Sequence, residues 1–384
     1  MKLKLPTPHG HKEPYKLIGK PLPVRKPRNP FNRVAFAAAH VVANPYADSD
    51  PSGSPAIDWE RTLGYRAYLL DLGFGIAEAM DTSQRGMGLD WPKAYELIGQ
   101  SLGAAGKRAG SIYSGCGTDQ LVAPQTRWLD DVITAYLEQL HAIQRLNGRI
   151  ILMASRALVH AAKSPEDYIK VYSRVLSESD HPVILHWLGD MFDPNLKGYW
   201  GSSDFLPAME TCLAVIDANQ SKVDGIKISL LDDAKEVAMR RRLPAGIKMY
   251  TGDDFNYPDL IAGDEQGHSH ALLGIFDAIA PAASAALAAL AKGNRTKYTA
   301  LMAPTVPLSR LIFRAPTQYY KTGIVFLAWL NGHQDHFIMV GGAQAMRPLP
   351  YFTEIFKLAD QAGLLANPEL AIKRMKQLLA IHGA

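Results

Sequence analysis

The sequence predicts an α/β fold: a closed (β/α)8 TIM barrel with an N-terminal extended arm and a C-terminal helical segment. Two observations indicate it. Eight apolar, strand-like runs follow one another along the chain, and stretches with helical periodicity separate them. Alternation of strands and helices is typical of a parallel sheet, and eight repeats suffice to close one. A doubly wound open sheet is the main alternative, but no glycine-rich dinucleotide or P-loop motif follows the first strand. The predicted strands are 33–43, 74–82, 110–118, 149–158, 181–189, 222–230, 246–254 and 267–275.

The helical stretches between the strands carry their own boundary signals. Residues 58–73 have apolar residues at helical spacing and end on Gly73, which is typical of a helix C-cap. Residues 164–179 begin with Ser164 as the N-cap, followed by Pro165 and by acidic residues in the first turn. These signals predict separate helices that connect successive strands.

The composition divides the chain into three parts. Residues 1–32 hold seven prolines and predict an extended arm, and residues 33–291 hold the barrel. Residues 292–384 predict a helical segment, because apolar periodicity recurs at 323–332, 350–363 and 367–383.

The charge distribution is mildly basic, with a net charge of +4 that is partly concentrated in the first 33 residues. A nucleic-acid-binding arm is one interpretation. A proline-rich solvated extension is preferred, because no basic helix rich in aromatic residues follows. We therefore expect no nucleic-acid partner.

Several features favour a cytoplasmic protein without membrane contact. Cys116 and Cys212 are too few for a disulfide framework or a CxxC metal pair. The N-terminus lacks the apolar core of a signal peptide. Residues 271–291 are apolar, but Asp277 and Pro281 interrupt them, so we predict a strand end, a turn and a buried helix there.

A lysine lies in the middle of the sixth predicted strand. One face of this strand carries Gly225, Lys227 and Ser229, and the other carries Ile226 and Ile228. The isoleucines suit the side that faces the helices, so Lys227 points into the barrel near the catalytic end of the strand. Desolvation there lowers the pKa of lysine from about 10.4, and a neutral amine can form a Schiff base with a carbonyl. The spacing is equally compatible with a lysine that pairs with an acid and does no chemistry.

The stretch 223–254, VDGIKISLLDDAKEVAMRRRLPAGIKMYTGDD, resembles the dihydrodipicolinate synthase / N-acetylneuraminate lyase family of class I aldolases. In the resemblance, Lys227 matches the Schiff-base lysine and residues 251–254, Thr-Gly-Asp-Asp, match a later family motif. Residues 181–190 match the family's fifth strand, and strand order matches over about residues 33–290. The resemblance implies a TIM barrel, a Schiff-base mechanism and a homo-oligomer.

The chain also departs from the family. The proton-relaying tyrosine of the fifth strand falls on His186, and the following asparagine falls on Trp187. The Gly-Thr-Thr-Gly-Glu loop falls on residues 80–84, Met-Asp-Thr-Ser-Gln, and the Pro-Tyr-Tyr motif falls near residues 155–158. We therefore expect a divergent branch with another substrate.

We expect Lys227 and His186 to be catalytic. The substrate-binding candidates are Asp81, Thr82, Tyr113, Arg156, Ser229 and Asp253. Alternative roles stay open: a structural histidine for His186, a partner of Glu78 or Asp81 for Arg156, and a helix cap for Asp253.

The predicted function is a Schiff-base-forming lyase, aldolase or dehydratase that acts on a small carbonyl compound through Lys227. The predicted substrate is a keto sugar or a sugar-derived keto acid. A neutral keto sugar or a derivative is preferred to pyruvate, because Asp81 would repel a carboxylate. We expect no metal and no cofactor, and a homodimer or tetramer, partly because the apolar run 323–332 needs a covering surface.

Two alternatives remain at this stage. One is a catalytically inactive binding barrel. The other is a divalent-metal-dependent sugar isomerase or aldolase, whose ligands would come from His40, Glu78, Asp81, His186, Asp190 and His268.

Overall fold

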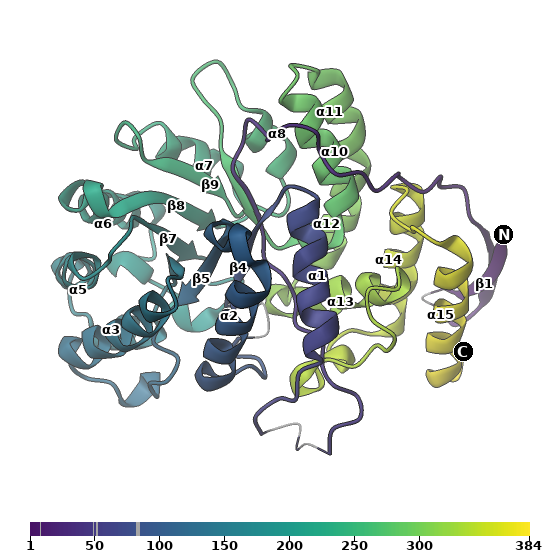
Figure 1. Cartoon of the computed structure of the whole chain (residues 1–384), viewed down its shortest axis with the longest axis horizontal. Coiled ribbons are helices and arrows are strands. Elements are labelled where there is room, and N and C mark those ends of the chain that lie inside the picture. Colours follow the sequence, from purple (N-terminus) through teal and green to yellow (C-terminus); the bar gives the residue numbers. More distant parts are fainter. Residues whose placement is uncertain (8, 49, 51–52, 82–84) are drawn as a thin grey trace.

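The computed structural model describes residues 1–7, 9–48, 50, 53–81 and 85–384, and in these residues eight parallel strands form a closed barrel. The ladder closes where Leu273 of the last strand pairs with Ala37 of the first. Figure 1 shows the strands inside a layer of helices. The predicted fold class is therefore confirmed. The barrel strands are β3 (Ala35–Ala37), β4 (Gly75–Glu78), β5 (Ile112–Cys116), β6 (Arg149–Leu152), β7 (Val183–Leu188), β8 (Val223–Ser229), β9 (Lys248–Thr251) and β10 (His270–Leu273).

The helices around the barrel begin and end near the predicted signals. Ser164 forms a capping box with Asp167, and Gly73, just past the C-cap of the first helix, has a φ of 90°. The helices are α1 (Trp59–Asp71), α2 (Trp91–Ala105), α3 (Leu129–Arg145), α4 (Arg156–Ala161), α5 (Pro165–Ser177), α6 (Phe205–Ala218), α7 (Asp233–Arg240), α8 (Tyr257–Ala262), α9 (Ile275–Ala278) and α10 (Ala280–Leu290).

The predicted strands extend beyond the observed ones, by up to six residues at the carboxyl ends of 33–43 and 149–158. The fourth predicted strand, 149–158, was too long, because β6 ends at Leu152 and α4 begins at Arg156. The Ser155 hydroxyl accepts the N–H of Leu158 (3.0 Å) and starts the helix as its N-cap.

The interior of the barrel is filled by apolar side chains from alternate strand positions. This cluster consists of Phe36, Ala38, Ala77, Met80, Ile151, Met153, Ile184, Tyr250 and Leu272, with Tyr113 packed against it. Glycine is required at one point in β8, because a Cβ atom on Gly225 would lie 2.8 Å from the ring of Tyr250. The packed interior leaves inward-facing polar groups to gather at the carboxyl ends of the strands.

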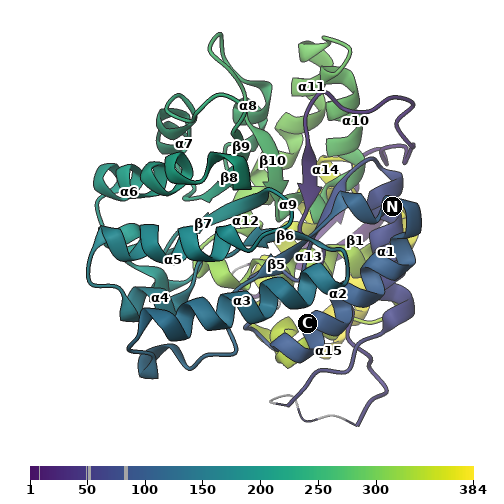
Figure 2. The same ribbon diagram turned by 60° about the vertical axis from the view of Figure 1, so that its left-hand side comes forward.

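The C-terminal segment covers one flank of the barrel (Figure 2). Its helices are α11 (Arg295–Met302), α12 (Val306–Ile312), α13 (Tyr320–Leu330), α14 (Leu349–Gln361) and α15 (Pro368–Ile381). Every residue of α13 is buried. Phe326 packs on Phe352 of α14 with ring centroids 4.9 Å apart. The apolar run 323–332 is therefore covered by its own chain and does not indicate a partner subunit.

The N-terminal arm is not only extended. Its strands β1 (Lys2–Pro6) and β2 (Lys12–Lys16) form an antiparallel hairpin. Asp360 of α14 holds the arm, because its carboxylate accepts the hydroxyl of Tyr15 (2.8 Å) and the N–H of Ile18 (2.8 Å). The hairpin thus lies beside the C-terminal helices, as Figure 1 shows.

Within the described residues, no helix is both long enough and apolar enough to cross a membrane. The segment 271–291 instead forms the end of β10, a turn, and helices α9 and α10, as predicted.

A buried acid lies between α7 and the start of β10. Glu236 is 1% exposed, and its carboxylate accepts the Ser269 hydroxyl (2.6 Å). Burial raises the pKa of Glu236 to about 8. An exposed glutamate has a pKa of about 4.3, so the folded protein holds this proton over a pH range in which the unfolded chain releases it.

We predict that this group makes the protein less stable as pH rises. The stability it provides is complete below about pH 4.3 and is lost as pH rises through about 8. Glu236→Gln removes the ionisation, so the variant should gain stability relative to the natural protein between pH 5 and pH 9, by an amount on the order of 1–3 kcal/mol. Thermal unfolding midpoints at pH 5, 7 and 9 measure this. A constant difference between the two proteins across that range would contradict the prediction.

Candidate active site

Lys227 and His186 lie side by side at the carboxyl ends of two neighbouring strands. They are paired in register between β7 and β8, and both are buried. Gly252, just after β9, makes room for the lysine, because a Cβ atom there would lie 2.7 Å from Cε of Lys227. The lysine therefore points into the barrel mouth, as the strand alternation predicted.

The amine of Lys227 makes no hydrogen bond or ion pair with any residue that the structure describes. Burial lowers its pKa, and the nearby charge of Lys321 acts in the same direction. The carboxylates of Asp81 and Asp254 oppose this shift without cancelling it. The site thus favours the uncharged, nucleophilic form of the amine.

His186 lies next to an acid and a hydroxyl. Its Nδ1 lies 3.3 Å from Oδ2 of Asp81, and its Nε2 lies 3.2 Å from Oγ of Ser229. A carboxylate can only accept, so we assign the hydrogen to Nδ1 and leave Nε2 to accept from Ser229. Burial lowers the pKa of His186, Lys227 lowers it further, and Asp81 only partly offsets these effects. The imidazole is therefore neutral near pH 7.

Asp81 is aimed at the mouth by a tight turn after β4. Ala79 in this turn has a φ of +50°, a left-handed conformation that costs energy in a residue with a side chain. The buried guanidinium of Arg85 donates to the carbonyls of Ala79 (3.3 Å) and Gly115 (2.5 Å) and holds the turn in place. Burial would raise the pKa of Asp81, but His186, Lys227 and Arg85 hold it below its usual value. The side chain is therefore an anion. Thr82, the next predicted residue, lies outside the described residues.

The acid beside Lys227 on the other side is Asp254, not the predicted Asp253. Asp254 is buried, and its Oδ1 accepts the N–H of Ile275 (2.8 Å). Burial raises the pKa of Asp254 to about 7, although Lys227 acts against the shift. Asp253 instead accepts the N–H groups of Phe255 (2.8 Å) and Asn256 (2.9 Å) in the turn before α8. It is not the helix cap of the alternative prediction, because the N-cap of α8 is Asn256.

A second buried lysine approaches the mouth from the C-terminal segment. Lys321 of α13 donates to the carbonyl of Ala38 and to Asp277 (3.1 Å). Asp277 also accepts from Nδ1 of His40 (3.0 Å). Burial alone would raise the pKa of Asp277, but His40 and Lys321 hold it well below the usual value. No local sequence signal indicated Lys321, because only the packing of α13 on the barrel brings it to the mouth.

Two predicted binding residues lie elsewhere. Tyr113 was expected to end its strand, but it is the second residue of β5, and its ring packs on Phe36 at 4.9 Å near the opposite end of the barrel. Arg156 begins α4, is half exposed and pairs with Asp193 rather than with Asp81 or Glu78. Of the predicted residues, those brought together are Lys227, His186, Asp81 and Ser229.

Of the residues proposed for a metal site, Asp81 and His186 lie together, but His40, Glu78 and His268 lie elsewhere. Glu78 forms a two-point ion pair with Arg66 at 2.8 Å, and His40 is bonded to Asp277. His268 packs on His270 at the start of β10, at the opposite face. Among the described residues, no group of three or more His, Cys, Asp or Glu side chains could hold a metal ion.

Comparisons with known proteins place the chain in a family and its fold among solved structures. The family model described as "Protein of unknown function (DUF993)" matches residues 3–384. None of the curated proteins matches the sequence.

Several solved structures share the fold. A prophage protein of the dihydrodipicolinic acid synthase family from E. coli K12, in complex with pyruvate, is 13% identical, with a TM-score of 0.66 over 87% of this chain and 99% of that chain. Dihydrodipicolinate synthase from Thermotoga maritima is 13% identical, with a TM-score of 0.65 over 88% and 100%. A putative dihydrodipicolinate synthetase from Pseudomonas aeruginosa is 14% identical, with a TM-score of 0.63 over 86% and 99%. The resemblance stated for residues 223–254 therefore extends to the fold of most of the chain.

Proposed function

The chain belongs to the family described as "Protein of unknown function (DUF993)", and we propose that it is a Schiff-base-forming lyase of the class I aldolase type. The observation that carries this proposal is the contrast between two buried lysines at one barrel mouth. Lys321 is bonded to a carbonyl and a carboxylate, as a structural lysine should be. Lys227 has neither kind of partner, and burial lowers its pKa. An unpaired amine with a lowered pKa at the catalytic end of a barrel is suited to attack a carbonyl carbon.

The first half of the reaction forms the Schiff base. The amine of Lys227 attacks the substrate carbonyl, and the carbonyl oxygen leaves as water after taking up two protons. Asp254 can supply a proton to this oxygen, because its pKa of about 7 keeps much of it protonated near neutrality. The product is an iminium ion on Lys227, whose positive charge lies between Asp81 and Asp254.

The second half breaks a bond next to the iminium. The neutral His186 takes the proton of a substrate hydroxyl, the carbon–carbon bond breaks, and its electron pair moves onto the iminium to give an enamine and an aldehyde. Proton return to the enamine and hydrolysis by water release the second product and the free amine. Loss of a hydroxyl as water from the same kind of enamine would make the enzyme a dehydratase.

The substrate that suits this site is a neutral, hydroxylated carbonyl compound such as a keto sugar. Asp81 is an anion, and Arg156 pairs with Asp193 and does not neutralise it. A substrate carboxylate about 4 Å from Asp81 would be repelled by about 1 kcal/mol in water and about 4 kcal/mol at an effective dielectric constant near 20. Substrate hydroxyls, in contrast, can donate to Asp81.

Lys227→Arg should abolish activity and borohydride trapping of keto compounds while the fold stays intact. Arginine keeps a positive charge but does not deprotonate at working pH, so it cannot form a Schiff base. Intact mass after borohydride reduction measures the adduct. Lys222→Arg is the matched control, because Lys222 bonds the carbonyl of Ser179 near the start of β8. Full turnover by Lys227→Arg would end the Schiff-base proposal.

His186→Phe should lower kcat by roughly 10²–10⁴-fold, the usual contribution of a positioned acid or base. Trapping should persist in this variant, because the amine remains. Steady-state kinetics and thermal unfolding are measured together. A loss of stability with an unchanged kcat would assign His186 a structural role only.

Asp81→Thr and Asp81→Asn should both increase trapping of pyruvate relative to neutral keto sugars. Each change removes the negative charge that repels a carboxylate, and the asparagine keeps the shape of the side chain. Trapping yields with pyruvate and with ketohexoses measure the preference. Efficient pyruvate trapping by the natural protein would refute the substrate proposal.

A further inference from the structure

An aromatic side chain from one wall of the barrel mouth reaches across to the opposite wall. Phe192 lies in the loop after β7 and is 4% exposed. Its ring meets those of Phe313 and Tyr320 edge-on, with centroids 6.3 Å away in both cases and interplanar angles of 71° and 88°. Edge-to-face contacts between aromatic rings are favourable at such distances. The chemistry assigned to Lys227 gives none of these three rings a role.

The two rings that Phe192 meets belong to the C-terminal segment and are fixed at other strand ends. Phe313 and Tyr320 are stacked on each other, with ring centroids 4.3 Å apart. A Cβ atom on Gly274, just after β10, would lie 2.9 Å from each of the two rings, so the stacked pair lies directly against that strand end. Next to Tyr320, Lys321 donates to the carbonyl of Ala38, just after β3.

The contact between Phe192 and these rings crosses the barrel mouth. In the closed ladder, β7 and β3 lie opposite each other, and the shorter path from β7 to β10 passes over the ends of β8 and β9. Lys227 of β8 points into the mouth below this path and is 8% exposed. Beyond the end of β9, the carbonyl of Asp254 accepts the hydroxyl of Ser309, from the helix that ends at Phe313. The three rings therefore form a cover over the reacting amine.

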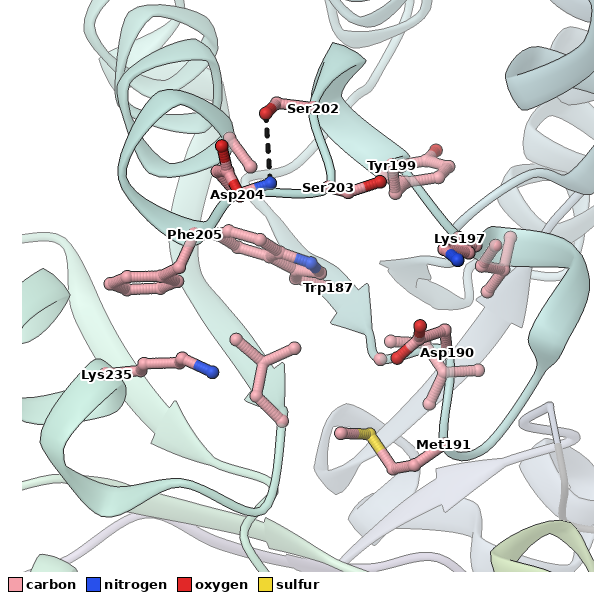
Figure 3. Close-up of a pocket in the computed structure, with 16 residues that line it drawn as sticks. Trp187, Asp190, Met191, Lys197, Tyr199, Ser202, Ser203, Asp204, Phe205 and Lys235 are labelled. Atoms are coloured by element: carbon pink, nitrogen blue, oxygen red, sulfur yellow. Dashed lines mark hydrogen bonds between the residues drawn. The ribbon is translucent and has the colours of Figure 1, made fainter.

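The loop that carries Phe192 has open space on its other side. Trp187 alternates along β7 with the inward-facing His186, so it faces the helices, and it lines a cavity of about 140 Å³ together with Asp190 and Met191. Figure 3 shows Asp190 and Met191 across this cavity from Trp187. A water molecule occupies about 30 Å³ of the liquid, so the cavity has room for a side chain of the loop. The loop thus has the aromatic cover on one side and space to move on the other.

Both ends of this loop are anchored, so movement is confined to its tip. Gly189 donates its N–H to the carbonyl of Ser229 in β8 (2.9 Å), and Asp193 pairs with Arg156 of α4. The N–H of Phe192 bonds the carbonyl of Gly189 (3.0 Å), within the loop itself. The ring of Phe192 therefore provides the contact that holds the tip against the opposite wall.

We propose that Phe192 is the gate of the barrel mouth: its ring closes the mouth over Lys227, and the substrate enters when the loop tip moves towards the cavity behind it. The proposal rests on the proposed function, in which Lys227 is the reacting amine. Closure keeps bulk water from the iminium ion, whose early hydrolysis returns the starting ketone and the free amine. An apolar gate also admits neutral compounds more readily than ions, because an ion loses hydration as it passes the rings. The gate thus favours a neutral substrate for a reason that does not depend on Asp81.

The test measures how fast the amine of Lys227 reacts with fluorodinitrobenzene, a bulky neutral reagent that modifies uncharged amines. Peptide mass spectrometry reports the modification of Lys227 relative to that of Lys170, an exposed lysine of α5, in the same sample. We expect Phe192→Ala to increase the rate at Lys227 by roughly tenfold or more, the factor that corresponds to lost ring contacts, and Phe192→Leu to increase it less. Added water around Lys227 in the variants favours the charged amine, which does not react, so a faster reaction reports access.

Phe31→Ala is the matched control. Phe31 packs on Phe74 with ring centroids 5.9 Å apart and precedes β3, so it lies at the other end of the barrel. Thermal unfolding midpoints of the three variants show whether each is folded at the assay temperature, and the leucine variant carries the test if the alanine variant is not. An unchanged rate at Lys227 in the folded Phe192 variants, or an equal increase in Phe31→Ala, would overturn the proposal.

Borohydride trapping of ketones in the same proteins separates the gate from the Schiff-base function. Fluorodinitrobenzene reacts with any accessible uncharged amine, so its rate does not depend on catalysis by Lys227. If no protein traps a ketone but the modification rates differ as expected, the Schiff-base function fails and the gate stands. If ketones are trapped at Lys227 but the Phe192 variants are modified no faster than the natural protein, the gate is refuted and the Schiff-base function stands.

Discussion

Closure of the barrel is the constraint on which the site depends. Because β10 pairs with β3 as well as with β9, every barrel strand has neighbours on both sides and cannot slip without breaking two ladders. This fixes which side chains face inward. The interior is packed with apolar groups such as Tyr250 and Met153, so polar inward residues lie near the ends of the strands. Lys227 is such a residue, and its position follows from closure rather than from any partner.

The buried charged residues around the barrel mouth differ in whether they have a bonded partner of opposite charge. Arg66 with Glu78 and Lys321 with Asp277 are pairs in which each charge has a bonded partner, as burial normally demands. Arg85 likewise bonds Asp119 at 2.6 Å. An unpaired amine in this surrounding lowers stability unless it is deprotonated, because a buried ammonium lacks its hydration. The fold therefore favours the uncharged amine of Lys227, whereas a purely structural lysine such as Lys321 is held as a charged group by its partners.

The sequence predicted most of the strands and helices, because the spacing of apolar residues that marks each of them involves only residues close together in the chain. It also predicted Lys227, His186 and Asp81 as site residues, through strand alternation and through the family resemblance at residues 223–254, 181–190 and 80–84. The sequence did not predict contacts between segments that are far apart in the chain. Arg156 pairs with Asp193, and Lys321 lies on a helix that begins 91 residues after the end of β8. The sequence itself could have indicated Asp254, rather than Asp253, as the residue that faces the site. Continuing the alternation from Tyr250 through Gly252 places Asp254 inward and Asp253 outward.

In the proposed reaction, the electrostatics of the mouth favour the intermediate over the resting state. At rest, His186 and Lys227 are driven towards neutrality, and Asp81 keeps its negative charge. Formation of the iminium places a positive charge on the lysine between Asp81 and Asp254. The fixed carboxylate thus stabilises a charge that develops during the reaction, which is the kind of interaction that accelerates a chemical step. A substrate with its own carboxylate would meet repulsion from Asp81 before the iminium forms, whereas a hydroxylated substrate can bind to Asp81 without changing the net charge. The preference for a neutral substrate and the stabilisation of the iminium therefore have the same physical origin.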